Sequence, residues 1–156
     1  MIQFLFLLFF LIPVFLFILT QQNTLIAIHP QNRLLQPGKV WLQLIPLFNF
    51  VWQFVVVTRI ADSIKKELSS NTFSFEAVPD IQPHLKKIRP TYSFGIAYCT
   101  LYICSLLPFL RGIPLMGLLV ILGFFVCWII YWIQLTGYKK QIEQKNYALL
   151  SPPSLP

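Results

Sequence analysis

The sequence predicts an all-α integral membrane protein with four transmembrane helices. Of its 156 residues, 56% are hydrophobic and only 11% are charged, and the apolar residues are gathered in long runs. A soluble domain is about half apolar and a quarter charged, and a spanning helix needs ~20 mostly apolar residues. We therefore expect one transmembrane domain over residues 1–138 and a cytoplasmic tail over 139–156, with a disordered end.

Four apolar runs are the predicted spans. The run at 2–19 lacks the basic start and the small-residue cleavage site of a signal peptide, so we interpret it as a retained helix, with a signal peptide as the alternative. The run at 41–58 follows the turn signal QPGK. The runs at 93–110 and 113–135 are joined so closely that they are expected to be antiparallel neighbours. Gly137 is expected to end the last helix.

Basic residues predict the orientation of the chain. The loop at 20–40 and the turn before the last span carry three Lys or Arg, whereas the loop at 59–92 and the tail carry nine. Because cytoplasmic loops are enriched in Lys and Arg, the loop at 59–92 and both termini are predicted to be cytoplasmic. The loop at 20–40 is then expected on the opposite side. The net charge of +7 faces anionic lipid, and no nucleic-acid partner is expected.

The second helix is expected to continue beyond the membrane as an amphipathic extension over residues 59–68. Ile60, Ile64 and Leu68 recur at helical spacing, while the charged residues occupy the other face. This apolar face is predicted to be a cytoplasmic contact surface for lipid or for another protein. A basic set is predicted either to bind lipid headgroups or only to determine the topology. Its members are Lys65, Lys66, Lys86, Lys87 and Arg89.

Two amides interrupt the second span. Asn49 and Gln53 are four residues apart and share a helix face, and Tyr98 and Tyr102 share a face of the third span. An unpaired amide in hydrocarbon costs several kcal/mol, so these faces are expected to point into the bundle. The favoured interpretation is hydrogen bonding between helices at ~0.6 to 2 kcal/mol per bond. The alternative is a polar path for a solute or an ion.

Residues suited to catalysis or metal binding are absent from the predicted spans, which contain no Asp, Glu, Lys, Arg or His. Proton-coupled transport and haem binding normally use such residues, so both are disfavoured. His29 and His84 stand alone, and Asp62 and Glu67 are interpreted as solvated surface. Cys99, Cys104 and Cys127 lie inside spans and are expected to pack as small apolar residues. No enzyme, cofactor or metal site is predicted.

The segment PGKVWLQLIPLFNFVWQFVVVTRIADSIKKEL resembles a group of small bacterial multi-pass membrane proteins that carry a domain of unknown function. In these proteins a span of the form W-x-x-x-I-P-x-x-N-x-x-W continues into an R-I-x-x-S helix. The matching positions are Trp41, Ile45, Pro46, Asn49, Trp52, Arg59, Ile60 and Ser63. The resemblance implies a bacterial cytoplasmic-membrane protein and transfers no catalytic residue. Pro46 is expected to kink the second span above Asn49.

These features together predict a non-enzymatic membrane protein that acts as an accessory or scaffold subunit. Its partners would be membrane lipid and either another membrane protein or a second copy of the chain, bound at the cytoplasmic face. The alternative is a small oligomeric channel or carrier in which Asn49 and Gln53 line a polar path. A dry bundle with satisfied amides would favour the first hypothesis, and a wetted track beside them the second.

Overall fold

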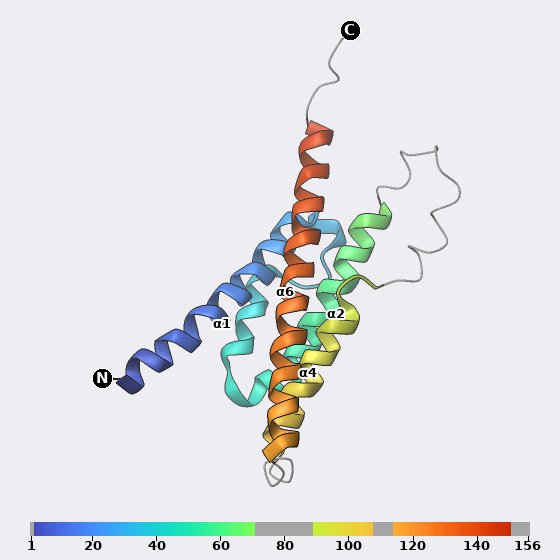
Figure 1. Ribbon diagram of the computed structural model, residues 1–156. Coiled ribbons are helices and arrows are strands. Elements are labelled where there is room, and N and C mark those ends of the chain that lie inside the picture. The colour runs from blue at the N-terminus through green and yellow to red at the C-terminus, as the bar shows by residue number, and fades with distance from the viewer. Residues whose placement is uncertain (1, 71–88, 108–113, 151–156) are drawn as a thin grey trace.

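The predicted helical class is confirmed by a computed structural model, which describes residues 2–70, 89–107 and 114–150 (Figure 1). Every element within these ranges is a helix. In chain order they are α1 (Ile2–Ala27), the 3₁₀ helices η1 (Pro30–Asn32) and η2 (Pro37–Leu44), α2 (Pro46–Ser70), α4 (Tyr92–Leu106) and α6 (Pro114–Leu150). His84, Lys86 and Lys87, the connection before the last helix and the end of the tail lie outside the described residues.

Among the residues whose side chains the structure describes, two helices are long and apolar enough to cross a membrane, and they lie at Pro46–Ser70 and Leu115–Tyr147. α6 does not end at Gly137, as the sequence predicted, but continues for 37 residues in all. A glycine inside a helix costs only about 1 kcal/mol, and the next turn compensates in part because Lys139 and Glu143 form an i,i+4 ion pair of 3.5 Å. The uncharged part of α6 is thereby joined to a charged extension without a break.

The second predicted span is not one continuous helix, because the chain reverses at Ile45. Its N–H bonds the Leu42 carbonyl at 3.2 Å, which ends η2, and Pro46 then begins α2. Proline has no N–H and its ring would clash with the carbonyl four residues earlier, so it suits the first position of a new helix. Trp52 Nε1 donates a hydrogen bond of 2.9 Å to the Lys39 carbonyl, so η2 runs back alongside α2. The expected kink is therefore a hairpin, which we call the 37–52 hairpin.

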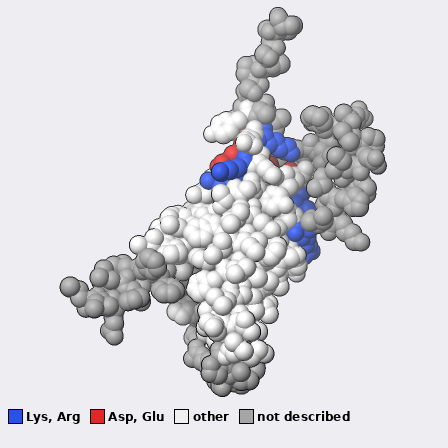
Figure 2. Space-filling view, viewed as in Figure 1, with Lys and Arg blue, Asp and Glu red and all other residues white. Residues whose placement is uncertain are grey.

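One end of the molecule, which we call the charged end, is formed where residues 27–34, 62–70 and 143–147 meet. Lys66 Nζ donates to the Gln31 carbonyl at 2.8 Å, and Asn146 Nδ2 donates to the Ala27 carbonyl at 3.1 Å. Figure 2 shows the Lys, Arg, Asp and Glu side chains gathered toward this end, while the lower part of that view carries none among the described residues.

These contacts correct the predicted orientation. Residues 27–34 were expected on the side of the membrane opposite to residues 62–70, yet the two segments are hydrogen-bonded to each other. Counting basic residues assumes that each apolar run crosses the bilayer once, and the 37–52 hairpin breaks that assumption. Figure 1 also shows α1 beginning away from the charged end and α6 finishing beyond it, so the two ends of the described chain lie apart.

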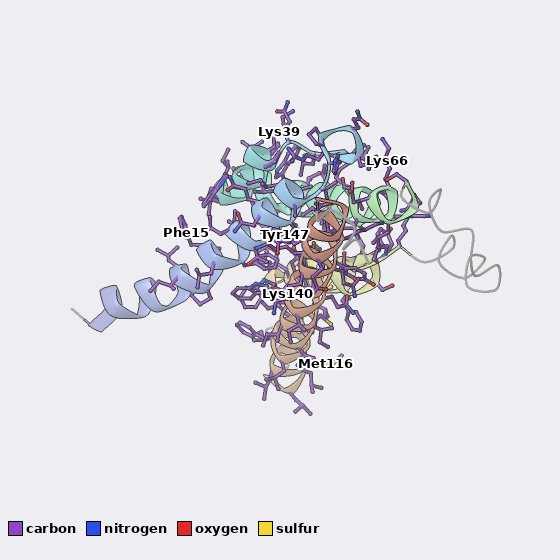
Figure 3. The ribbon with its side chains drawn as sticks, turned by 90° about the horizontal axis from the view of Figure 1, so that it is seen from above. Phe15, Lys39, Lys66, Met116, Lys140 and Tyr147 are labelled. Atoms are coloured by element: carbon purple, nitrogen blue, oxygen red, sulfur yellow. The ribbon has the colours of Figure 1, made fainter. Side chains whose placement is uncertain are left out.

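The core lies where α2, α4 and α6 meet the C-terminal half of α1. Tyr131 of α6 is fully buried there, and Gly95 of α4 packs against it. A Cβ atom at Gly95 would overlap the Val57 side chain and lie 2.9 Å from the Tyr131 ring. Glycine is therefore required for the approach of α4 to α2 and α6. Figure 3 shows α1 running outward from this core, with Phe15 on its outer part.

Candidate functional site

The candidate site is a cavity of about 500 Å³ below the charged end. Every long helix and the 37–52 hairpin contribute to its wall. Its lining residues are Pro13, Val14, Phe17 and Ile18 of α1, Gln43 of η2, Asn49 and Gln53 of α2, Tyr98 and Tyr102 of α4, and Phe124, Phe125 and Trp128 of α6. A cavity of this size is in the range of ~300–1,000 Å³ that small-molecule sites occupy.

The structure brings the four predicted polar residues, Asn49, Gln53, Tyr98 and Tyr102, to this one cavity. Each pair lies four residues apart on its helix, so both members face the same way. No hydrogen bond between either amide and either hydroxyl is found in the described part of the chain, as mutual pairing of the four would require. The four residues thus line one cavity without bonding one another in the described chain.

Two polar side chains of the lining are buried and lack a hydrogen-bond partner among the described residues. Gln53 is 4% exposed and Tyr98 is 3% exposed, and the unpaired atoms are Gln53 Nε2 and the Tyr98 hydroxyl. A buried polar group left unpaired costs about 1–3 kcal/mol. Gln21 Nε2, Thr91 Oγ1, the Tyr131 hydroxyl and Asn146 Oδ1, which lie outside the lining, are buried and unpaired in the same way.

Two glutamines, Gln43 of η2 and Gln21 of α1, hold the 37–52 hairpin against α1. Gln43 Nε2 donates to Gln21 Oε1 at 2.6 Å and to the Val40 carbonyl at 3.1 Å. Trp41 Nε1 donates to Gln22 Oε1 at 2.7 Å, one residue along α1. Gln43, which lines the cavity, is therefore held in place by hydrogen bonds and not only by apolar packing.

Aromatic rings form most of the remaining wall. Phe17 is central, with ring centroids 6.0 Å from Tyr98 and 5.3 Å from Trp128. Phe124 approaches Tyr102 at 5.9 Å and Tyr98 at 6.4 Å. Rings at these separations attract one another edge-to-face or in offset stacks. The wall is therefore ordered without hydrogen bonds and presents flat apolar surfaces to the cavity.

The mouth of the cavity is apolar. Val14 and Phe125 line the cavity and are 40% and 37% exposed. No Asp, Glu, Lys, Arg or His belongs to the lining found within the described ranges. The cavity thus communicates with its surroundings past hydrocarbon side chains.

The predicted contact surface lies elsewhere and is not free. Ile60 and Ile64 are fully buried and Leu68 is half-buried. The Leu34 N–H bonds Ser63 Oγ at 2.9 Å. The prediction of an exposed docking face at these residues is therefore wrong for the described chain.

The burial of Glu67 differs most from what the sequence predicted. It was interpreted as solvated, yet it is 1% exposed. Its Oε2 accepts hydrogen bonds from the His29 N–H at 3.1 Å and from Asn32 Nδ2 at 2.7 Å. The spacing contained the signal, since Glu67 lies on the same helix face as Ile60 and Ile64. A charged residue on a predicted apolar face indicates a buried polar contact.

The predicted headgroup residues are partly engaged within the chain. Arg89 lies 3.3 Å from Asp62 and 5.2 Å above the Tyr92 ring, and Lys66 bonds the Gln31 carbonyl. Among the residues described, no group of three or more His, Cys, Asp or Glu comes together to hold a metal ion.

Comparison of the chain with known protein families, curated proteins and solved structures gave no match. The geometry of the cavity is therefore the basis on which a function is inferred.

Proposed function

We propose that this protein is a membrane-embedded binding protein whose cavity holds a small molecule dissolved in the bilayer. The observation that carries the proposal is the cavity itself, about 500 Å³ in volume, whose wall combines apolar side chains with the polar side chains of Asn49, Gln53, Tyr98 and Tyr102. A site with apolar walls and a few convergent polar groups is the usual design of a small-molecule pocket.

The exposed surface of α6 supports the location in a membrane. Leu115, Leu118 and Ile133 are 68%, 55% and 67% exposed, on a helix whose charged residues begin only at Lys139. Such a surface is suited to lipid tails and not to water. In the proposed arrangement the charged end lies at the cytoplasmic surface, and the 37–52 hairpin dips into the bilayer from that side.

The 37–52 hairpin is helical on both sides of its reversal at Ile45, and η2 packs against both α1 and α2. The reversal itself is exposed, with Leu44 at 50%, Ile45 at 49% and Leu47 at 83%. In the proposed arrangement these apolar side chains face lipid. This arrangement replaces the four complete spans expected from the apolar runs.

A binding cavity accounts for the site better than the two earlier hypotheses do. An accessory subunit docking through Ile60 and Ile64 would have to expose side chains that are fully buried. A path for ions would require a lining dominated by polar groups, whereas aromatic and aliphatic side chains outnumber polar ones around this cavity.

The test is whether the purified protein retains a bilayer component in its cavity. Native mass spectrometry after extraction in mild detergent would compare wild-type protein with Val14→Trp, which blocks the mouth. The control is Ile12→Trp on the same helix, at a residue that is 57% exposed and outside the cavity lining. We expect a retained molecule in wild-type and Ile12→Trp protein and its loss in Val14→Trp. Equal retention by all three proteins, or none by any, would refute the proposal.

A further inference from the structure

The chain between α1 and η2 forms a second pocket, which shares no lining residue with the cavity described above. Its volume is about 350 Å³, and all of its lining residues lie within positions 30–39. Arg33 and Lys39 both line it, together with Leu34 and Gln36. We propose that this pocket, which we call the loop pocket, binds the phosphate group of an anionic phospholipid. The inference shares with the proposed function only the location of the chain in a membrane.

The side chain of Arg33 is held in one orientation. Its Nε donates a hydrogen bond of 2.7 Å to the Ile28 carbonyl, and its Nη2 donates one of 2.8 Å to the Ile26 carbonyl. The last carbonyls of a helix lack intrahelical partners, so these bonds also cap the end of α1. Nη1 makes no hydrogen bond within the described chain. An arginine fixed in this way loses little conformational freedom when it binds an anion.

The two cations of the loop pocket lack an acidic partner among the described residues. The structure describes three carboxylates, and each lies 3.3 to 3.5 Å from a nitrogen of some other side chain. The charges of Arg33 and Lys39 are therefore not compensated by the described chain. Phosphate is an anion whose oxygens match the donors of arginine. The three carboxylate pairs are Asp62 with Arg89, Glu67 with His29, and Glu143 with Lys139.

The surroundings of the loop pocket favour a phospholipid over free phosphate. Leu34 lines the pocket and is 40% exposed, and Ile26, whose carbonyl binds Arg33, is 51% exposed. These side chains can contact the acyl chains of a lipid, whereas free phosphate would leave them in water. Trp52 donates its indole hydrogen bond to the Lys39 carbonyl, and tryptophan is enriched at the level of the headgroups. Figure 3 shows Lys39 at the outer edge of the molecule, where a headgroup could reach it.

The experiment is native mass spectrometry of the purified, delipidated protein in a non-ionic detergent, with each probe titrated in. The probes are dihexanoylphosphatidylglycerol, which is anionic, dihexanoylphosphatidylcholine, which has the same phosphodiester but no net charge, and inorganic phosphate, which has no acyl chains. We expect the phosphatidylglycerol to bind at least about fivefold more tightly than either of the others, because only it combines a net negative charge with acyl chains.

Lys39→Gln is the principal variant, because Arg33 also caps α1. It should weaken phosphatidylglycerol binding about fivefold, as the loss of one basic contact to an anionic headgroup does. The matched control is Lys140→Gln, at an exposed lysine of α6 outside the loop pocket. That change should leave the affinity within about twofold of wild type, since its charge lies elsewhere. Melting temperatures in detergent would verify that both variants remain folded.

The outcomes separate the loop pocket from diffuse charge and from the cavity. Equal weakening by Lys39→Gln and Lys140→Gln would overturn the inference, because general attraction to the net charge would then explain binding. Equal affinity for phosphatidylcholine or inorganic phosphate, or no binding of phosphatidylglycerol, would also overturn it. Val14→Trp should leave phosphatidylglycerol binding unchanged. A phospholipid lost in Val14→Trp but kept in Lys39→Gln would belong to the cavity, which would refute the loop pocket and leave the proposed function standing.

Discussion

The carboxylate of Glu67 accepts a hydrogen bond of 2.7 Å from the side chain of Asn32, 35 residues earlier in the chain. The same oxygen accepts the His29 N–H, and His29 Nδ1 lies 3.5 Å from the other carboxylate oxygen. One buried side chain thereby holds the segment after α1 over the apolar face of α2. Further along the chain, Trp52 bonds the Lys39 carbonyl and Gln43 bonds Gln21. These bonds hold η2, which contributes Gln43 to the cavity wall.

Replacement of Glu67 by alanine is expected to destabilise the protein. The change leaves the His29 N–H and the Asn32 amide without an acceptor, which should lower the free energy of unfolding by ~2 kcal/mol. Glu67→Gln keeps one acceptor oxygen and should cost less. Thermal unfolding in detergent, followed by circular dichroism, would measure both changes. The exposed Glu143→Ala change is the control and should shift stability by only ~0–0.5 kcal/mol. Equal effects at Glu67 and Glu143 would contradict the buried role of Glu67.

Gly95 is expected to tolerate no side chain. Its Cβ position overlaps Val57 and lies against Tyr131, so Gly95→Ala should cost ~1–3 kcal/mol through overpacking. The matched control is Gly137→Ala in α6, where nothing lies within 4 Å of the new atom. That change should be neutral or stabilising by up to ~1 kcal/mol, because alanine favours the helix. Unfolding curves of the two variants would have to differ in sign or size for this account to stand.

The Tyr98 hydroxyl is expected to destabilise the empty protein. Tyr98→Phe removes a buried group that has no partner in the described chain while keeping the ring, so it should raise the stability of delipidated protein by ~1 kcal/mol. Melting temperatures of the delipidated wild-type and Tyr98→Phe proteins would test this. A large loss of stability in delipidated Tyr98→Phe would show that the hydroxyl already has a partner.

The charged end predicts a specific crosslink. Asn32 Nδ2 lies 2.9 Å from Ser70 Oγ, so the double variant Asn32→Cys with Ser70→Cys, in a background without Cys99, Cys104 and Cys127, should form a disulfide under mild oxidation. The control pairs Asn32→Cys with Met116→Cys, near the opposite end of α6. Electrophoresis without reductant, before and after protease digestion between the two positions, would detect the bond. Two segments on opposite sides of a bilayer could not form it.

Part of the candidate site could be predicted from the sequence. Asn49 with Gln53, and Tyr98 with Tyr102, share helix faces through local spacing alone, and the cost of a bare amide in lipid directs such faces inward. The aromatic wall could not be predicted, because Phe occurs in every one of the apolar runs. Nothing in their order distinguishes Phe17, which lines the cavity, from Phe15, which packs against Trp41 of η2 instead.

By itself, the sequence determined the helical class, the apolar runs and the faces of individual helices, since these depend on residues within one or two turns of one another. Only the tertiary structure decided that Pro46 begins a new helix in a hairpin, and that Ile60, Ile64 and Glu67 are buried. Those outcomes depend on contacts between separate segments, such as the hydrogen bond from Trp52 to Lys39 and the bond from Asn32 to Glu67. The composition of one segment does not show which other segment of the chain will pack against it.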